Sequence, residues 1–152
     1  MLFRSFHDLA AVVAMMFERQ AARKGLVVLN DVPPGIEVRA DRDRLSQILV
    51  NLVDNAVKYT PDGGQVTLAA ALAPGRSVEV RVADTGAGIP SLDLPRITER
   101  FYRVDKARSR ELGGTGLGLA IVKHLVQAHG GTLAIESTLG KGTTVRFTLP
   151  AA

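Results

Sequence analysis

The sequence predicts an α+β fold, a two-layer α/β sandwich in which a mixed, mostly antiparallel sheet packs on about three helices. Segments with helical periodicity alternate with segments of strand periodicity, and two pairs of neighbouring strands are joined by short turns typical of antiparallel hairpins. This order favours helices layered on one sheet. The chain has 152 residues, 46% of them hydrophobic, which is enough for one core. We therefore expect residues 1–152 to form a single domain.

Each element is predicted from a local pattern of apolar residues and from the turn residues that flank it. The predicted elements are, in chain order, a helix over residues 5–24, strands over 26–31 and 36–40, a helix over 43–60, strands over 65–73 and 77–83, a helix over 115–129, and strands over 132–137 and 142–149. Ser5 and Asp41 are placed to cap the first two helices, and Gly25 and Gly130 to end the first and third. Residues 91–114 are charged and weakly periodic, so we expect a largely irregular, mobile segment with one helical turn.

The helix over residues 43–60 has two distinct faces. Its apolar residues recur at helical spacing: Leu45, Ile48, Leu49, Leu52, Val53, Ala56 and Val57. Gln47, Asn51, Asn55 and Lys58 fall together on the opposite side. Such a face is usually only solvated, but asparagine is a mediocre helix former, and two of them one turn apart argue against that interpretation. Their amide groups, followed by an ammonium group, suit a hard cation and a phosphate chain, so we interpret this face as a ligand-binding wall.

Residues 84–90, DTGAGIP, place a carboxylate at a strand end, followed by two glycines. Glycines let the backbone pass close to a ligand. The carboxylate of Asp84 suits an exocyclic amine such as the N6 amine of adenine. A plain turn closed by the aspartate side chain is an equally good interpretation of these residues alone.

Residues 113–118, GGTGLG, lead directly into the third predicted helix. Glycines before a helix leave backbone N–H groups free to hold an anion, and the helix dipole assists. The spacing is neither that of a P-loop nor that of a dinucleotide-binding fingerprint. Alone the pattern is weak, but the asparagine wall, the aspartate turn and this segment together would serve metal, base and phosphate groups.

Composition excludes several other kinds of site. The chain has no cysteine, so disulfides and thiolate metal sites are excluded, and its three histidines lack metal-ligand spacing. The net charge is +4, and residues 96–110 hold six Lys/Arg against two acidic residues. Without an aromatic platform or recognition helix, we expect no nucleic-acid binding there. The longest apolar run, residues 9–17, is far shorter than a membrane span, so we expect a cytoplasmic domain without membrane contact.

Four ordered segments resemble the sequence boxes of a known family. They are NLVDNAVKYTP (51–61), DTGAGIP (84–90), ERFYRVD (99–105) and GGTGLGLAIVKHLVQAHGG (113–131). They are similar to the N, first glycine, F and second glycine boxes of the catalytic ATP-binding domain of bacterial sensor histidine kinases. GTTVRFTLP (142–150) also resembles the family's last strand. The resemblance covers the chain from about Asp8 and implies the Bergerat-type ATP-binding sandwich shared with gyrase-type topoisomerases and mismatch-repair ATPases.

The resemblance also implies ligands, ATP and Mg²⁺, and roles for individual residues. By this resemblance, Asn55 would bind the metal with Asn51 beside it, and Lys58 and Tyr59 would contact the phosphates and the nucleotide edge. Asp84 would bind the adenine amine, and the purine pocket would involve Gly86, Gly88 and Ile89, with Thr143 supporting the base. Phe101 and Arg103 would belong to a lid over residues 91–114, and the triphosphate would be wrapped by Gly114, Thr115, Gly116, Leu117 and Gly118. Asn51, Lys58 and Arg103 are the expected catalytic residues. None need act as a strong base, because phosphoryl transfer depends on positioning and charge neutralisation.

Two departures from the family pattern bear on function. Thr98 stands where the F box has its first phenylalanine, which leaves Phe101 and Tyr102 as the aromatic residues of the lid. His7, Asp8 and Leu9 only faintly resemble a histidine box, so we expect the phosphoacceptor dimerisation domain to be absent from this chain. The chain is then a fragment of a longer kinase, with the histidine-bearing helices of that kinase and a response regulator as partners.

Three alternatives remain open at this point. An ATP hydrolase of the same fold would carry a glutamate base one turn before the metal asparagine, where this chain has Asn51. A nucleotide-sensing module without catalysis is compatible with Thr98. A nucleic-acid binder built on residues 96–110 is the remotest of the three.

Overall fold

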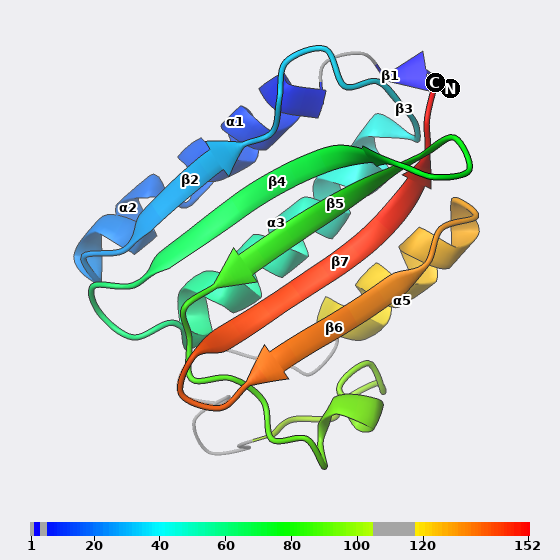
Figure 1. The fold of residues 1–152 in the computed structure, drawn as a ribbon. Helices are drawn as coiled ribbons and strands as arrows, with labels where there is room; N and C mark the ends of the chain where they lie inside the picture. The colour runs from blue at the N-terminus through cyan, green and yellow to red at the C-terminus, as the bar shows by residue number, and fades with distance from the viewer. Residues whose placement is uncertain (1, 4–5, 105–117) are drawn as a thin grey trace.

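A five-stranded sheet forms one layer of the protein, and helices cover one of its faces (Figure 1). The computed structural model describes residues 2–3, 6–104 and 118–152. The helices in this part are α1 (Phe6–Met16), α2 (Glu18–Arg23), α3 (Arg42–Tyr59) and α5 (Gly118–Ala128), with a short 3₁₀ turn, η1 (Leu94–Arg96). The strands are β1 (Leu2–Phe3), β2 (Val27–Asp31), β3 (Val38–Arg39), β4 (Gln65–Ala73), β5 (Ser77–Asp84), β6 (Leu133–Thr138) and β7 (Gly142–Pro150). The predicted two-layer α/β sandwich is confirmed.

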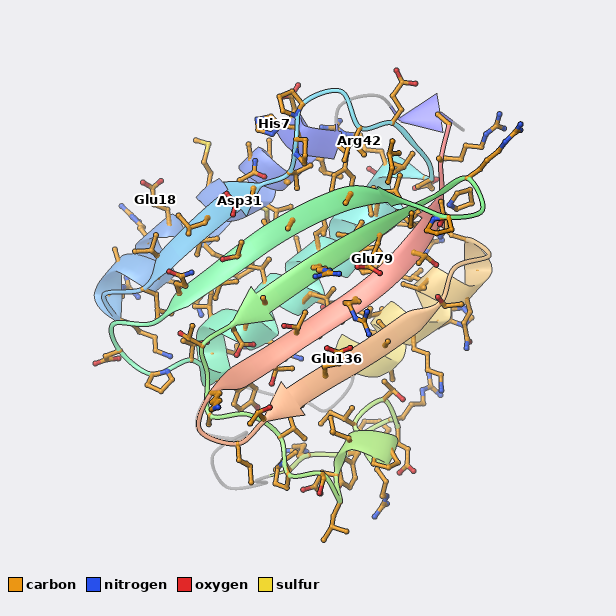
Figure 2. The ribbon with its side chains drawn as sticks, viewed as in Figure 1. His7, Glu18, Asp31, Arg42, Glu79 and Glu136 are labelled. Atoms are coloured by element: carbon orange, nitrogen blue, oxygen red, sulfur yellow. The ribbon has the colours of Figure 1, made fainter. Side chains whose placement is uncertain are left out.

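The sheet is mixed and mostly antiparallel, with strand order β2-β4-β5-β7-β6. Both predicted hairpins, β4–β5 and β6–β7, are present, and only the β2–β4 pair is parallel. Alternate residues of the three central strands are buried against the helices: Val66, Leu68, Ala70, Val78, Val80, Val82, Val145, Phe147 and Leu149. The opposite face is polar at its centre, where Arg146 forms ion pairs with Glu79 and Glu136 (Figure 2). Alternation along the strands therefore assigns one face of the sheet to the core.

Helix α3 lies under the sheet and has the register that its sequence predicts. All seven residues of the predicted apolar face are buried. Asp41 caps the helix, because its Oδ1 accepts a hydrogen bond of 3.0 Å from the Arg44 N–H. At the other end, the Nζ of Lys24 donates to the carbonyls of Val57 and Lys58, at 2.8 and 3.2 Å. Both ends of α3 are thus held by side chains that satisfy otherwise unpaired backbone groups.

The prediction of one helix over residues 5–24 is wrong in one respect. The segment forms two helices, α1 and α2, separated by Phe17, whose backbone (φ −103°, ψ 3°) leaves the helical path. The break allows the buried Phe17 ring to enter the core, while α1 packs on α3 and α2 on β2. The predicted cap Ser5 lies outside the described residues.

Within residues 2–3, 6–104 and 118–152, none of the helices has the length and apolar character that a bilayer span requires.

Two further differences concern short segments. The strand expected over residues 36–40 shrinks to β3, which pairs with β1, a strand that the sequence does not predict. Residues 91–104 are irregular apart from η1, in agreement with the prediction for this part of the lid. The expected start of the third helix at residue 115 lies outside the described residues, and α5 is described from Gly118.

Replacing the cap residue of α3 should destabilise the whole fold, because α3 carries much of the core. We expect Asp41→Ala to lower the free energy of unfolding by about 1 kcal/mol, and Asp41→Asn, which keeps the acceptor oxygen, to cost far less. Urea denaturation measures both. Asp62→Ala, at an exposed aspartate outside the helices, is the control and should change the value by less than about 0.5 kcal/mol. Equal losses in the Asp41→Ala and Asp62→Ala variants would contradict a capping role.

Candidate functional site

Three segments that carry predicted site residues meet at one end of the molecule. The end of α3, the turn after β5 and the β6–β7 turn lie together in Figure 1. Hydrogen bonds join them: the Ala87 N–H donates to the Tyr59 carbonyl at 3.5 Å, and the Gly140 N–H to the Ala87 carbonyl at 2.8 Å. The turn over residues 84–90 is therefore held between the end of α3 and the β6–β7 hairpin.

The carboxylate of Asp84 is the most constrained acidic group of this region. Its Oδ1 accepts hydrogen bonds from the N–H groups of Gly86, at 2.8 Å, and Thr143, at 3.3 Å. Burial raises the pKa of Asp84 above its ordinary value of 3.8, and the two backbone hydrogen bonds oppose that rise. Among the described residues, Oδ2 of Asp84 has no hydrogen-bond partner. The orientation of the group is thus fixed while Oδ2 is left to accept from a ligand.

The two predicted glycines of the turn are required by its geometry. A Cβ on Gly86 would lie 2.7 Å from Asp84 Oδ1 and 2.8 Å from the Tyr59 carbonyl oxygen, so a larger residue would push the turn off α3. Gly88 has a φ of +78°, a conformation that favours glycine. Both glycines let the backbone pass close to neighbouring protein atoms, and their predicted place beside a ligand stays a prediction.

One residue of this region, Ser137 on β6, was missed by the sequence analysis. Its Oγ accepts a hydrogen bond of 2.7 Å from the Ile89 N–H and lies 2.8 Å from the Oγ1 of Thr143. Ser137 and Thr143 are direct partners across the β6–β7 hairpin. Thr143 thus touches both Asp84, through its N–H, and Ser137, through its hydroxyl. The only sequence signal for Ser137 is its register opposite Thr143, which the predicted hairpin contains.

The polar face of α3 borders this turn. Asn51, Asn55 and Lys58 are half-buried, whereas Gln47 is exposed. In the described part of the chain, neither asparagine amide forms a hydrogen bond with another residue. The Lys58 Nζ lies 2.9 Å from Asp54 Oδ2, a contact that the sequence analysis did not single out. Half-buried amides without protein partners are suited to bind a ligand.

Residues 91–104 hold the described part of the predicted lid. Phe101 is 64% exposed and has a φ of +64°, a conformation that is costly for a bulky residue. Tyr102, by contrast, donates its hydroxyl hydrogen bond to Asp93, and the guanidinium carbon of Arg96 lies 4.5 Å from the centre of the Tyr102 ring. Arg103 is half-buried. The aromatic residue that holds this loop is therefore Tyr102, while Phe101 projects from it.

The second glycine segment is placed only at its end. Gly114, Thr115, Gly116 and Leu117 lie outside the described residues, and α5 is described from Gly118 onward. Their predicted contact with a triphosphate stays a prediction.

A cavity of about 620 Å³ lies between α3, α5 and the lid. Its lining includes Arg44, Gln47, Thr98, Arg100 and Lys123. Gln47 is the one residue of the predicted ligand-binding wall in this lining, and Asn51, Asn55, Lys58 and Asp84 do not line it, so we give this cavity no role in nucleotide binding.

The groups at the end of α3 and β5 match the chemistry of ATP and Mg²⁺. Asp84 offers a fixed acceptor for an amine. Asn51 and Asn55 offer amide oxygens, which a hard cation accepts as ligands, and Lys58 offers a positive charge. The residues present therefore fit a magnesium nucleotide.

Comparison with known proteins places the chain in a family. Residues 40–152 match the family described as histidine kinase-, DNA gyrase B-, and HSP90-like ATPase. The chain is 52% identical to the sensor histidine kinase WalK of Bacillus subtilis (strain 168) over 114 residues, which are 74% of this chain and 19% of WalK. It spans between about a fifth and two fifths of the length of the curated relatives that it matches.

Solved structures give the same result. The crystal structure of full-length ShkA in complex with AMPPNP matches with a TM-score of 0.86 and 37% identity, over 99% of this chain and 31% of ShkA. The mycobacterial sensor histidine kinase MprB matches with a TM-score of 0.83 and 30% identity, over 99% of this chain and 98% of that structure. The chain therefore belongs to the family of histidine kinase-, DNA gyrase B- and HSP90-like ATPases, as an ATP-binding catalytic domain of the sensor histidine kinase type.

Proposed function

We propose that this chain binds ATP with Mg²⁺ and transfers the γ-phosphoryl group to a histidine on a separate helical dimerisation domain, in two-component signal transduction. The observation that carries the proposal is the fixed, partly buried carboxylate of Asp84, in a turn that is hydrogen-bonded to the end of α3. On that helix, the amides of Asn51 and Asn55 have no hydrogen-bond partner among the described residues. The AMPPNP complex of ShkA, a structural neighbour, supports nucleotide binding by this fold. A response regulator is the proposed receiver of the phosphate downstream.

The base is held at the turn after β5. Asp84 Oδ2 accepts a hydrogen bond from the adenine amine, while Oδ1 stays bonded to Gly86 and Thr143. Gly86, Gly88 and Ile89 form the wall beside the purine. A charged acceptor makes a stronger hydrogen bond than a neutral one, so Asp84 selects for a base that donates at this position.

The phosphates are held at the end of α3. Asn55 provides the amide oxygen for Mg²⁺, with Asn51 beside it, and Lys58 and Tyr59 meet the phosphates. Bound Mg²⁺ neutralises the charge of the phosphate oxygens. The lid over residues 91–114, with Phe101 and Arg103, and the glycines of residues 114–118 close over the triphosphate. These side chains orient the nucleotide, and none of them removes a proton.

The phosphoacceptor is proposed to lie on another domain, because His7 and His129 of this chain contact the backbone of other segments. His7 lies at the opposite end of the molecule from the β6–β7 turn, and its Nδ1 contacts the Val32 carbonyl at 2.5 Å (Figure 2). The Nε2 of His129 accepts a hydrogen bond from the Asp41 N–H, at the start of α3, and the Nδ1 of His129 contacts the Leu125 carbonyl of α5. The site occupies the second half of that 18-residue helix, from Asn51 onward, which begins roughly 14 Å from its start. Transfer needs a nucleophile within about 3.5 Å of the phosphorus.

Phosphate transfer can be tested directly. Given labelled ATP and Mg²⁺, the chain alone should stay unlabelled, and its cognate histidine-bearing domain, added as a separate protein, should slowly gain acid-labile phosphate. Transfer should be slow because an untethered substrate lacks the effective concentration that a linker provides. Label on His7 would overturn the proposal. Without the acceptor, ATP turnover of the order of 1 s⁻¹ would instead favour the hydrolase, because Asn51 cannot deprotonate a water.

Asp84→Asn should lower ATP affinity while the chain stays folded. Asparagine keeps an acceptor for the two backbone bonds but loses the charge, so we expect a loss of more than about 1 kcal/mol in calorimetry. Lowering the pH should weaken ATP binding to the wild type already above pH 3.8, because the raised pKa of Asp84 lets the carboxylate take up a proton earlier than an ordinary aspartate. The Asp84→Asn variant controls for the titration of ATP itself, and its ATP affinity should lack the part of the pH dependence that comes from Asp84.

The stability of the same variant serves as its folding control. The pKa of Asp84 is raised in the folded state, so the stability linked to its protonation is present below pH 3.8 and is lost as the pH rises through the raised value. Asp84→Asn should therefore be at least as stable as the wild type at pH 7. A folded variant with unchanged ATP affinity would remove Asp84 from the base site.

Asn55→Ala should remove the dependence of ATP affinity on Mg²⁺. The ion prefers oxygen ligands, and the variant lacks the proposed amide oxygen. Calorimetric titrations of each protein with ATP, once with Mg²⁺ and once with a chelator, give the difference in ATP affinity that Mg²⁺ makes. Asp43→Ala, at an exposed position in the first turn of the same helix, should keep the wild-type difference. A folded Asn55→Ala protein whose ATP binding is still strengthened by Mg²⁺ would exclude Asn55 as the ligand.

A further inference from the structure

The ammonium group of Lys58 already has a partner in the structure. Its Nζ lies 2.9 Å from Asp54 Oδ2, one helical turn earlier on α3. The side chains of Lys58 and Asp54 are only 21% and 34% exposed. Exposed pairs of this spacing usually stabilise a helix weakly. This pair is different in its position, because it lies beside the asparagines that have no partner among the described residues.

The helical geometry shows to which side Lys58 is drawn. At about 100° per residue, and measured from Asn51, Asp54 lies at about −60°, Lys58 at about −20° and Asn55 at about +40°. Lys58 is therefore flanked by Asp54 on one side and Asn55 on the other. The contact with Asp54 holds the ammonium on the side away from Asn55.

We propose that Asp54 competes with nucleotide phosphate for the ammonium of Lys58 and so weakens nucleotide affinity. The inference rests on the proposed function, in which Lys58 meets the phosphates. A phosphate that binds Lys58 must replace an existing charge-assisted hydrogen bond, so only part of the new interaction appears as affinity. Asp54 is thus a positioning residue, which acts on the nucleotide through Lys58.

The competition has a consequence for the product. The proposed kinase must release ADP after each transfer, and a partner that recaptures Lys58 favours this step. The neighbouring Lys24 does not replace Lys58 in this role, since its Nζ is bonded to the Val57 and Lys58 carbonyls.

The first test is the ADP and ATP affinity of Asp54→Asn, measured by calorimetry with Mg²⁺ and with a chelator. Asparagine has nearly the same shape but no charge, so we expect binding that is about two- to five-fold tighter, the range that a half-exposed ion pair allows. Asp54→Glu keeps a carboxylate within reach of Lys58 and should restore the wild-type affinity. Asp43→Asn makes the same change of charge in the first turn of α3, away from Lys58, and should have no effect.

The second test asks whether the effect passes through Lys58. In a Lys58→Met background, Asp54→Asn should leave nucleotide affinity unchanged. An equal tightening in that background would mean that Asp54 repels the phosphates directly, and would overturn the inference. Weaker binding of Asp54→Asn only in Mg²⁺ would make Asp54 a metal ligand, which also overturns it.

The outcomes separate this inference from the proposed function. A wild-type chain that binds no nucleotide refutes both. A wild-type chain that binds ATP, with Asp54→Asn at the same affinity, refutes only the role of Asp54.

Discussion

The packing of α3 against the sheet is the constraint on which the candidate site depends. Seven apolar residues of α3 are buried, so the helix cannot rotate without exposing them. Its ends are also held, by Asp41 at the start and by Lys24 at the last carbonyls. The opposite face is therefore fixed in direction as a by-product of core packing. Asn51 and Asn55 are presented by a rigid element, which suits a site that needs precise placement.

The turn after β5 depends on this packing in turn. It is bonded to the Tyr59 carbonyl at the end of α3 and to Ser137 and Thr143 of the β6–β7 hairpin. These contacts hold Asp84 in a partly buried setting, where burial raises its pKa and so works against the charged form. Such a setting is unfavourable for the charged carboxylate, at the position where the proposed function needs a charged acceptor. The fold accepts this cost because the surrounding backbone N–H groups offset part of it.

Local sequence patterns predicted most of the helices and strands. They did not predict the features that depend on contacts between segments far apart in the sequence. The hairpins and α3 follow from alternation, helical periodicity and the cap residue Asp41. The parallel β2–β4 pair, the β1–β3 pair and the break at Phe17 depend on what each segment packs against, which no local pattern contains.

The site divides in the same way. The residues of the turn and of the α3 face were predicted because each lies within one short segment. Ser137 was missed because its contact with Ile89 joins residues 48 positions apart. The Asp54–Lys58 pair has the spacing of an ordinary surface pair, and only the structure shows that it is half-buried beside the asparagines.

The direction of the helices adds a further electrostatic argument. The contact of His129, after α5, with the start of α3 sets the two helices antiparallel, so that α5 begins on the side of the second half of α3 (Figure 1). The end of α3 carries the negative pole of its dipole and the start of α5 the positive pole of its own. In the proposed arrangement, a phosphate chain is attracted by α5 and repelled by the last turn of α3. Lys58 is the residue of that turn that offsets the repulsion, which is why the carboxylate that holds it, Asp54, is in a position to control nucleotide affinity.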